Sequence, residues 1–192
     1  MPTDLELLAL CQESYDRTTI ESEDAHVLVT EAVGVTIFAF RGTDPRCIVD
    51  LWRDADSLTV SDHLLGELHQ GFYQDACSVA WQLVPLAKPG CIITGHSKGG
   101  AEALVFAGML VSLGVIPGLV TTFGSACPGL LPMVGVIPGT DWRNCYDQIP
   151  YLPRRPRPRP LTQLGLSKSC FNPLDDHGLD QYANSLRALA HT

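Results

Sequence analysis

Ser97 stands between two glycines in the stretch "GHSKG", residues 95–99, where a β-favouring run gives way to a helical pattern. A strand–turn–helix unit of this kind holds a serine hydroxyl above the carboxyl edge of a sheet, because the glycines let strand and helix approach closely. The free N–H groups at the start of the helix favour a developing oxyanion. The pattern predicts a nucleophile, and a glycine-rich turn without chemistry is the alternative.

A serine nucleophile needs a histidine that takes its proton, and in this type of fold the order along the chain is serine, acid, histidine. His177 and His191 are the histidines that follow Ser97. His191 is the penultimate residue, where fraying of the chain end works against accurate placement. We therefore expect His177 to be the general base, with an ordinary surface histidine or weak metal binding beside two aspartates as alternatives.

The acid that orients the base should lie between Ser97 and His177 and near a strand end. Asp147 follows the predicted strand "DWRNCY" and precedes the rigid segment "QIPYLP". Asp175 and Asp176 are so close to His177 in sequence that they would reach its far ring nitrogen with difficulty. Asp141 opens the strand, at the wrong edge of the sheet. These considerations favour Asp147.

The elements that must position these residues alternate along the chain. We expect strands at residues 26–32, 34–40, 91–94, 118–125 and 141–146, the last of these being the final strand, and helices at residues 4–15, 71–86, 97–113 and 175–191. Strands alternating with helices predict an α/β fold with a mostly parallel central sheet and helices on both faces. No internal repeat or domain boundary is visible, so residues 1–192 are expected to form a single domain.

Five segments, in order, resemble the class 3 (fungal-type) lipase family of the α/β-hydrolase superfamily. They are "IFAFRGT" (residues 37–43), "LHQGFYQ" (68–74), "IITGHSKGGAEA" (92–103), "TTFGSACPG" (121–129) and "YDQIPYLP" (146–153). The resemblance covers roughly residues 25 to 180. It implies the α/β-hydrolase fold and the same triad of Ser97, Asp147 and His177. It also implies an oxyanion hole made by the backbone N–H groups of Thr43 and Lys98, and it gives His69 and His96 no part in the triad.

The chain departs from the family pattern at two places. Lys98 stands where the family usually has a small or apolar residue after the serine. Residues 44–57 lie where the secreted fungal enzymes carry a helical lid, and here the segment is charged rather than broadly apolar. We therefore expect a compact version of the fold with a reduced lid, which favours an esterase or phospholipase over a lipase that opens on oil droplets.

A stretch of prolines and arginines, "PRRPRPRP", lies between Asp147 and His177 and should flank the rim of the site. A solvated extended loop is the simple interpretation. The alternative is that Arg154, Arg155, Arg157 and Arg159 contact anionic head groups or an acidic membrane surface. A peptide ligand for aromatic-lined grooves is a further alternative.

Composition restricts the class of protein. Hydrophobic residues make up 45% and charged residues 18%, as in a globular domain, and the net charge of −8 argues against nucleic acid as a partner. The apolar run within residues 103–116 is too short to span a membrane, and a buried helix is expected there. No secretory signal is visible, so we expect a cytoplasmic protein or one released without a classical signal. Seven cysteines without a Cys-x-x-Cys pair are expected to be reduced.

Together these observations predict a serine hydrolase that cleaves carboxylic esters, with lipid esters as the main substrate class. The apolar segment "LLPMVGVIPG", residues 130–139, would line an acyl site if it lies near the serine. No cofactor or metal is implied. A phospholipase A, an acyltransferase or a thioesterase on the same triad, and a catalytically silent binding module, are the alternatives.

Overall fold

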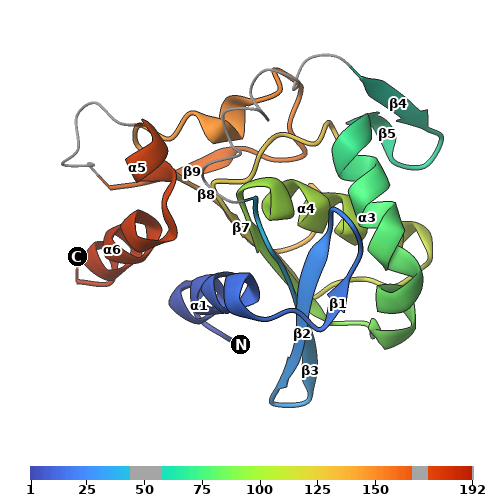
Figure 1. Ribbon diagram of the computed structural model, residues 1–192, viewed down its shortest axis with the longest axis horizontal. Coiled ribbons are helices and arrows are strands. Elements are labelled where there is room, and N and C mark those ends of the chain that lie inside the picture. Colours follow the sequence, from blue (N-terminus) through green and yellow to red (C-terminus); the bar gives the residue numbers. More distant parts are fainter. Residues whose placement is uncertain (44–57, 166–172, 192) are drawn as a thin grey trace.

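The computed structural model describes residues 1–43, 58–165 and 173–191 of the chain (Figure 1). Its centre is a seven-stranded sheet with the order β1-β2-β3-β6-β7-β8-β9. The pairs β1–β2 and β2–β3 are antiparallel, and every pair from β3 to β9 is parallel. The strands are β1 (Ile20–Glu21), β2 (His26–Ala32), β3 (Val35–Phe40), β6 (Ile92–His96), β7 (Leu119–Phe123), β8 (Asp141–Asn144) and β9 (Leu161–Leu164).

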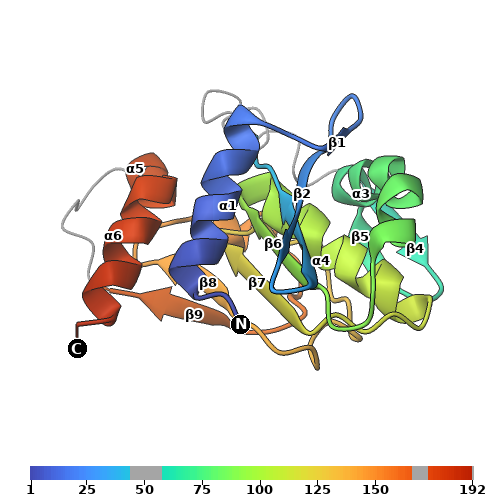
Figure 2. The ribbon, with the colours of Figure 1, turned by 90° about the horizontal axis from the view of Figure 1, so that it is seen from below.

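Helices cover both faces of this sheet, as predicted. On one face lie α1 (Asp4–Asp16) and α6 (Leu179–Leu189), and on the other lie α3 (Gln70–Leu83) and α4 (Ser97–Ser112), as Figure 2 shows. Neighbouring residues of one strand divide between the two cores, because side chains alternate across a sheet. Ile92 packs under α1 and α6, whereas Ile93 packs under α3 and α4.

Helix α4 is strongly apolar, and most of its residues are buried. Twelve of its residues, from Ser97 to Leu110, are buried against the sheet and α3. Its burial explains the apolar composition after Ser97. Among the described residues no helix is long and apolar enough to cross a membrane.

Four features differ from the elements predicted from the sequence. The two-residue strand β1, which pairs with β2, has no counterpart among the predicted strands. The strand at Asp141 is not the last one, because β9 follows the proline- and arginine-rich stretch and extends the parallel sheet. The segment before α3 contains a separate two-stranded sheet of β4 (Thr59–Asp62) and β5 (Gly66–His69). The C-terminal helix is broken at Gly178 into the short α5 (Pro173–His177) and α6. Strands of four residues carry little periodicity, which is why the sequence did not reveal them.

Two further predictions concern the cysteines and the lid. The described cysteines Cys11, Cys77, Cys91, Cys127 and Cys145 are free thiols. Burial raises the pKa of Cys11 to about 12, so this thiol stays protonated and behaves as a core side chain. The predicted reduced lid at residues 44–57 lies outside the described residues and stays a prediction.

Candidate functional site

Ser97 sits at the turn between α4 and β6, which is the central strand of the seven-stranded sheet. Its φ angle is 57°, in the left-handed region that a residue with a Cβ rarely adopts, and its side chain is fully buried. Such strain persists only where the surrounding structure enforces it, and it is common at functional sites. The residue before Ser97 ends a strand and the residue after it lies in a helix, as expected for a nucleophile on a strand-to-helix turn.

The two glycines of "GHSKG" are required by close packing. A Cβ on Gly95 would clash with the backbone of Gly99, and a Cβ on Gly99 would clash with the carbonyl oxygens of Phe40 and Arg41. The start of α4 is therefore pressed against the end of β3. A Cβ on Gly42, the next residue but one after Phe40, would lie 3.1 Å from Ser97 Cβ. This packing places the turn that contains Thr43 beside Ser97.

Asp147 and His177 form a buried pair. His177 Nδ1 lies 2.8 Å from Asp147 Oδ2, and because a carboxylate can only accept, Nδ1 carries the proton and Nε2 is left free to accept one. Two more donors hold the carboxylate: the Tyr182 hydroxyl reaches Oδ2 at 2.6 Å, and the Ile149 N–H reaches Oδ1 at 2.9 Å. The histidine is thus fixed in the tautomer that a general base needs.

The backbone of the end of β7 must be close to this pair. Gly124 follows β7 with φ at 58°, and a Cβ on it would lie 2.8 Å from Asp147 Oδ2 and 2.9 Å from His177 Nδ1. Glycine is therefore the residue that permits both the backbone angle and the contact. The backbone at the end of β7 therefore passes directly beside both Asp147 and His177.

His96 connects Ser97 to His177. Its Nε2 lies 2.8 Å from the His177 carbonyl oxygen and therefore donates, while its Nδ1 accepts from the Tyr15 hydroxyl at 3.0 Å. Burial, with the nearby His177, lowers the pKa of His96 to about 3, so this ring stays neutral. The rings of His96 and His177 are 4.7 Å apart between centroids. His96 thus braces His177 and does not titrate near neutral pH.

Ser97 and His177 each have a buried polar atom without a partner. Ser97 Oγ and His177 Nε2 make no hydrogen bond with any described group. Buried polar atoms are normally paired, so such exceptions call for an explanation. If Ser97 and His177 act as nucleophile and base, their lack of partners is explained. The contact between such groups is often long in a substrate-free site and becomes short when the substrate binds.

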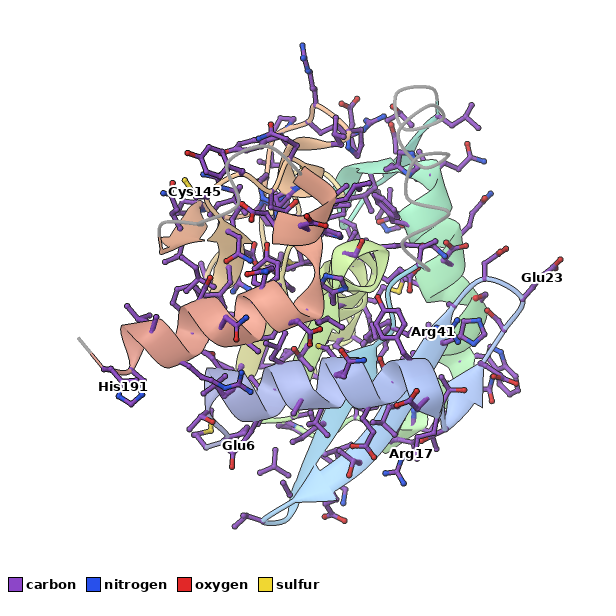
Figure 3. All side chains as sticks on the ribbon, turned by 60° about the vertical axis from the view of Figure 1, so that its left-hand side comes forward. Glu6, Arg17, Glu23, Arg41, Cys145 and His191 are labelled. Carbon is purple, nitrogen blue, oxygen red and sulfur yellow. The ribbon has the colours of Figure 1, made fainter. Side chains whose placement is uncertain are left out.

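Among the other acids and histidines considered from the sequence, none contacts His177 as Asp147 does. Asp141 accepts from the Thr122 hydroxyl at 2.7 Å and from Arg159 at 2.8 Å. Asp176 accepts from the Tyr146 N–H at 3.0 Å, and Asp175 is exposed on α5. His191 lies at the end of α6, at the edge of the molecule (Figure 3).

The Lys98 side chain points away from the reacting groups. Its ammonium donates to the Asp24 carbonyl at 2.6 Å and pairs with Asp75 at 2.9 Å and with Glu102 at 3.1 Å. Burial by itself lowers the pKa of Lys98, but Glu102 and Asp75 together outweigh it and leave that pKa raised. The side chain therefore ties α4 to α3 and to the segment before β2, and only the Lys98 backbone is available to an oxyanion.

Two of the four arginines proposed for the rim are turned into the protein. Arg159 donates to the Asp141 carboxylate, and Arg157 donates to the Pro150 carbonyl at 2.7 Å and to the Ser125 carbonyl at 3.2 Å. Both are largely buried, so these guanidinium groups stabilise the crossing from β8 to β9. Arg154 is exposed, and Arg155 is partly buried.

The apolar loop at residues 130–139 does not lie where an acyl site beside Ser97 would be. Leu131 and Val134 pack against Gly108, which is eleven positions beyond Ser97, or about 16 Å along the axis of α4. Leu131, Val134 and Ile137 are core residues of the α3–α4 face. For these three residues the condition on which an acyl site was expected here, closeness to Ser97, is therefore not met.

Sequence reasoning did not identify Tyr182 or Tyr15. Tyr182 lies on α6 and Tyr15 on α1, and neither belongs to a recognisable motif. A tyrosine on an amphipathic helix is read as a packing residue unless the partner of its hydroxyl is known. Within the described ranges no cluster of side chains suited to a metal ion is present.

The sequence profile of the family described as "Lipase (class 3)" matches residues 37–133, which is half of the chain. This chain belongs to the class 3 lipase family. It is therefore a carboxylic ester hydrolase with the α/β-hydrolase fold and a serine nucleophile. The matched region runs from β3 through Ser97 to the loop after β7, and thus includes the strand-to-helix turn that carries the serine.

Solved structures agree with this fold. The triacylglyceride lipase of Rhizomucor miehei superposes with a TM-score of 0.63 at 21% identity, over 79% of this chain and 74% of that one. A triacylglycerol lipase whose catalytic centre is described as a serine protease triad gives the same TM-score at 23% identity and the same coverage. The triacylglycerol lipase of Penicillium expansum gives 0.59 at 17% identity, over 84% of this chain and 77% of that one. No curated protein matches this class 3 lipase significantly.

Proposed function

We propose that this class 3 lipase hydrolyses lipid esters through an acyl-enzyme on Ser97, with His177 as general base and Asp147 as the acid that orients it. The contact that carries the proposal is the buried 2.8 Å pair of His177 Nδ1 and Asp147 Oδ2. It leaves His177 Nε2 as an unpartnered acceptor, in a site where Ser97 Oγ is also unpartnered. A lipase neighbour described as having a serine protease triad supports the same assignment.

In the first half of the reaction Ser97 Oγ attacks the ester carbonyl and gives its proton to His177 Nε2. The charge that develops on the carbonyl oxygen is proposed to rest on the backbone N–H groups of Thr43 and Lys98. The packing of Gly42 against Ser97 supports this placement of the Thr43 turn. Losing one such donor typically costs about 10²–10³ in kcat.

His177 then passes its proton to the leaving alcohol, whose bond to the acyl carbon breaks, and the first half ends with the acyl group on Ser97. In the second half a water molecule gives a proton to His177 Nε2 and attacks the acyl carbon. The bond from that carbon to Ser97 Oγ then breaks, His177 returns the proton to Oγ, and the carboxylic acid leaves. Asp147, held by Tyr182 and Ile149, keeps the imidazole oriented while its charge rises and falls. No cofactor or metal takes part in this scheme.

Lipid esters are the proposed substrate class because the solved neighbours act on triacylglycerols, and peripheral contact with a lipid surface belongs to the same proposal. The alternatives differ in the leaving group or the acceptor. A phospholipase A would prefer a phospholipid, a thioesterase would prefer a thioester, and an acyltransferase would transfer the acyl group to an added alcohol. Because Arg157 and Arg159 are engaged internally, Arg154 and Arg155 are left as the arginines that could meet an anionic head group.

The test combines a fluorophosphonate probe with hydrolysis of p-nitrophenyl esters. Ser97→Ala should lose both labelling and hydrolysis, and Asp147→Asn and His177→Ala should each lower kcat by about 10⁴ or more. Ser112→Ala, at the far end of α4, is the matched control and should keep both. A wild-type chain that resists the probe would instead indicate a catalytically silent binding module.

A further inference from the structure

Two cavities lie in line between α1 and α6. The inner one has a volume of about 480 Å³ and the outer one about 320 Å³. Gln12, Leu179 and Asp180 line both of them, so the two are parts of one groove, named here the α1–α6 groove. Figures 2 and 3 show the two helices side by side on the same face of the sheet. The groove therefore follows the line along which α1 and α6 meet.

The inner end of the α1–α6 groove borders the proposed base, although Ser97 itself is not among its lining residues. His177 lines it, together with His96, the residue before Ser97. Tyr15 lines it as well, and the Tyr15 hydroxyl is the atom nearest to where a Cβ on Gly42 would lie. The groove thus begins beside the proposed base and beside the turn that leads to Thr43.

The outer part of the groove is mainly apolar. Leu5, Leu8 and Ala9 line it from α1, and Leu179 and Ala183 line it from α6, with Arg187 at its far end. From Leu179 to Arg187, α6 advances about 12 Å. An apolar channel of this length suits a hydrocarbon chain, because each methylene removed from water contributes to binding.

We propose that the α1–α6 groove is the acyl-chain site of this enzyme, with the ester group at the His177 end and the chain running toward Arg187. The inference rests on the proposed function, since it assumes that the ester reacts at Ser97 and His177. It places the acyl chain away from Leu131 and Val134, which pack into the core beside Gly108. Asp175 and Gln181, which line only the inner cavity, place polar groups near the ester end.

The proposal is tested by blocking the groove at two points. Ala183→Trp fills the outer part from α6, and Gln12→Trp narrows the region that both cavities share. Each variant should lower kcat/KM for p-nitrophenyl decanoate by about tenfold or more and change kcat/KM for p-nitrophenyl butyrate by less than about twofold. The difference is expected because each excluded methylene group costs about fourfold in binding.

Ala188→Trp is the matched control, because Ala188 is exposed on α6 and lines neither cavity. It should leave the ratio of decanoate to butyrate hydrolysis unchanged. Equal losses on both esters in the two groove variants, or an unchanged ratio, would overturn the acyl assignment. A change that follows the leaving alcohol in a series of acetate esters would overturn it in favour of an alcohol site. Failure of the wild-type chain to hydrolyse butyrate would instead count against the proposed function.

Discussion

At the scale of single residues, the site depends on which atoms have partners. The Asp147 carboxylate is held by His177, Tyr182 and the Ile149 N–H, while Ser97 Oγ and His177 Nε2 have no partner among the described groups. Both oxygens of the Asp147 carboxylate thus have donors. In the proposed mechanism, the contact that still has to form is the one between Ser97 Oγ and His177 Nε2.

Tyr182→Phe tests the hydroxyl that shares Asp147 Oδ2 with His177. Losing a 2.6 Å hydrogen bond to a charged group should lower kcat about tenfold and leave KM within about twofold. Tyr182 lines neither cavity of the α1–α6 groove, which is why KM should hold. The measurements are steady-state kinetics and thermal unfolding on the same samples.

Tyr151→Phe is the control for this change, because Tyr151 is half-exposed and its ring lies over Arg143. It should leave kcat unchanged. If Tyr182→Phe lowered only the unfolding temperature and not kcat, Tyr182 would be a packing residue and not a positioning residue.

At the scale of elements, the ends of β3, β6 and β7 bring the site together. Their parallel pairing puts Gly42, Ser97 and Gly124 at the same edge of the sheet. Each of these three positions then meets a close neighbour: Gly42 meets Ser97, and Gly124 meets Asp147 and His177. The strand ends therefore determine which side chains can approach one another.

Gly124→Ala tests this close approach. The new Cβ would lie 2.8 Å from Asp147 Oδ2 in a backbone with φ at 58°, so the acid and the base should move apart. We expect kcat to fall by about 10² or more, because small displacements of catalytic groups are costly. Hydrolysis of p-nitrophenyl butyrate measures the loss.

Gly34→Ala is the matched control for backbone strain. Gly34 has φ at 76° in the β2–β3 turn, and a Cβ there would meet nothing within 4 Å. This variant should lose about 1 kcal/mol of stability, as expected for a side chain in the left-handed region, and should keep its kcat. An equal loss of kcat in both variants would contradict the role given to Gly124.

At the scale of the whole molecule, two separate hydrophobic cores pack on the two faces of the sheet. A buried cluster of charged side chains lies between α3 and α4 on one of these faces. Lys98 on α4 pairs both with Asp75 on α3 and with Glu102, one turn further along α4. Glu102 is fully buried, and burial raises its pKa to about 8 although Lys98 partly opposes the shift. Single-domain organisation of residues 1–192 stays a prediction.

The raised pKa of Glu102 links folding to pH. The folded protein keeps a proton on Glu102 that the unfolded chain releases above the ordinary glutamate pKa, so stability should fall as the pH rises from about 4.5 to 8 and then level off. Glu102→Gln removes this dependence. The free energy of unfolding of Glu102→Gln, minus that of the wild type, should therefore increase as the pH rises from about 4.5 to 8. The increase should be on the order of 2–4 kcal/mol.

Chemical unfolding at pH 5, 6.5 and 8 would measure this change. Glu31→Gln, an exposed glutamate on β2, is the control and should keep the pH dependence of the wild type. A Glu102→Gln variant with the same pH dependence as the wild type would show that Glu102 is ionised in the folded protein at neutral pH.

The sequence by itself determined the local elements and the family. The "GHSKG" stretch and the alternation of strands with helices predicted the turn that carries Ser97, and five ordered motifs indicated the class 3 lipases, which the family match confirmed. These features could be read because strand and helix periodicity and glycine turns are local properties of the chain. The choice of Asp147 and His177 followed from the order of residues and stays a prediction of role.

Only the tertiary structure decided which side chains meet across long stretches of sequence. In the folded chain the Tyr182 hydroxyl donates to Asp147, and the Lys98 ammonium pairs with Asp75. Arg157 and Arg159 point into the protein. The tertiary structure also packs Leu131 and Val134 beside Gly108, far along α4 from Ser97, and it forms the α1–α6 groove beside His177. Long-range contacts of this kind depend on how layers pack, and packing leaves no periodic signal in the chain.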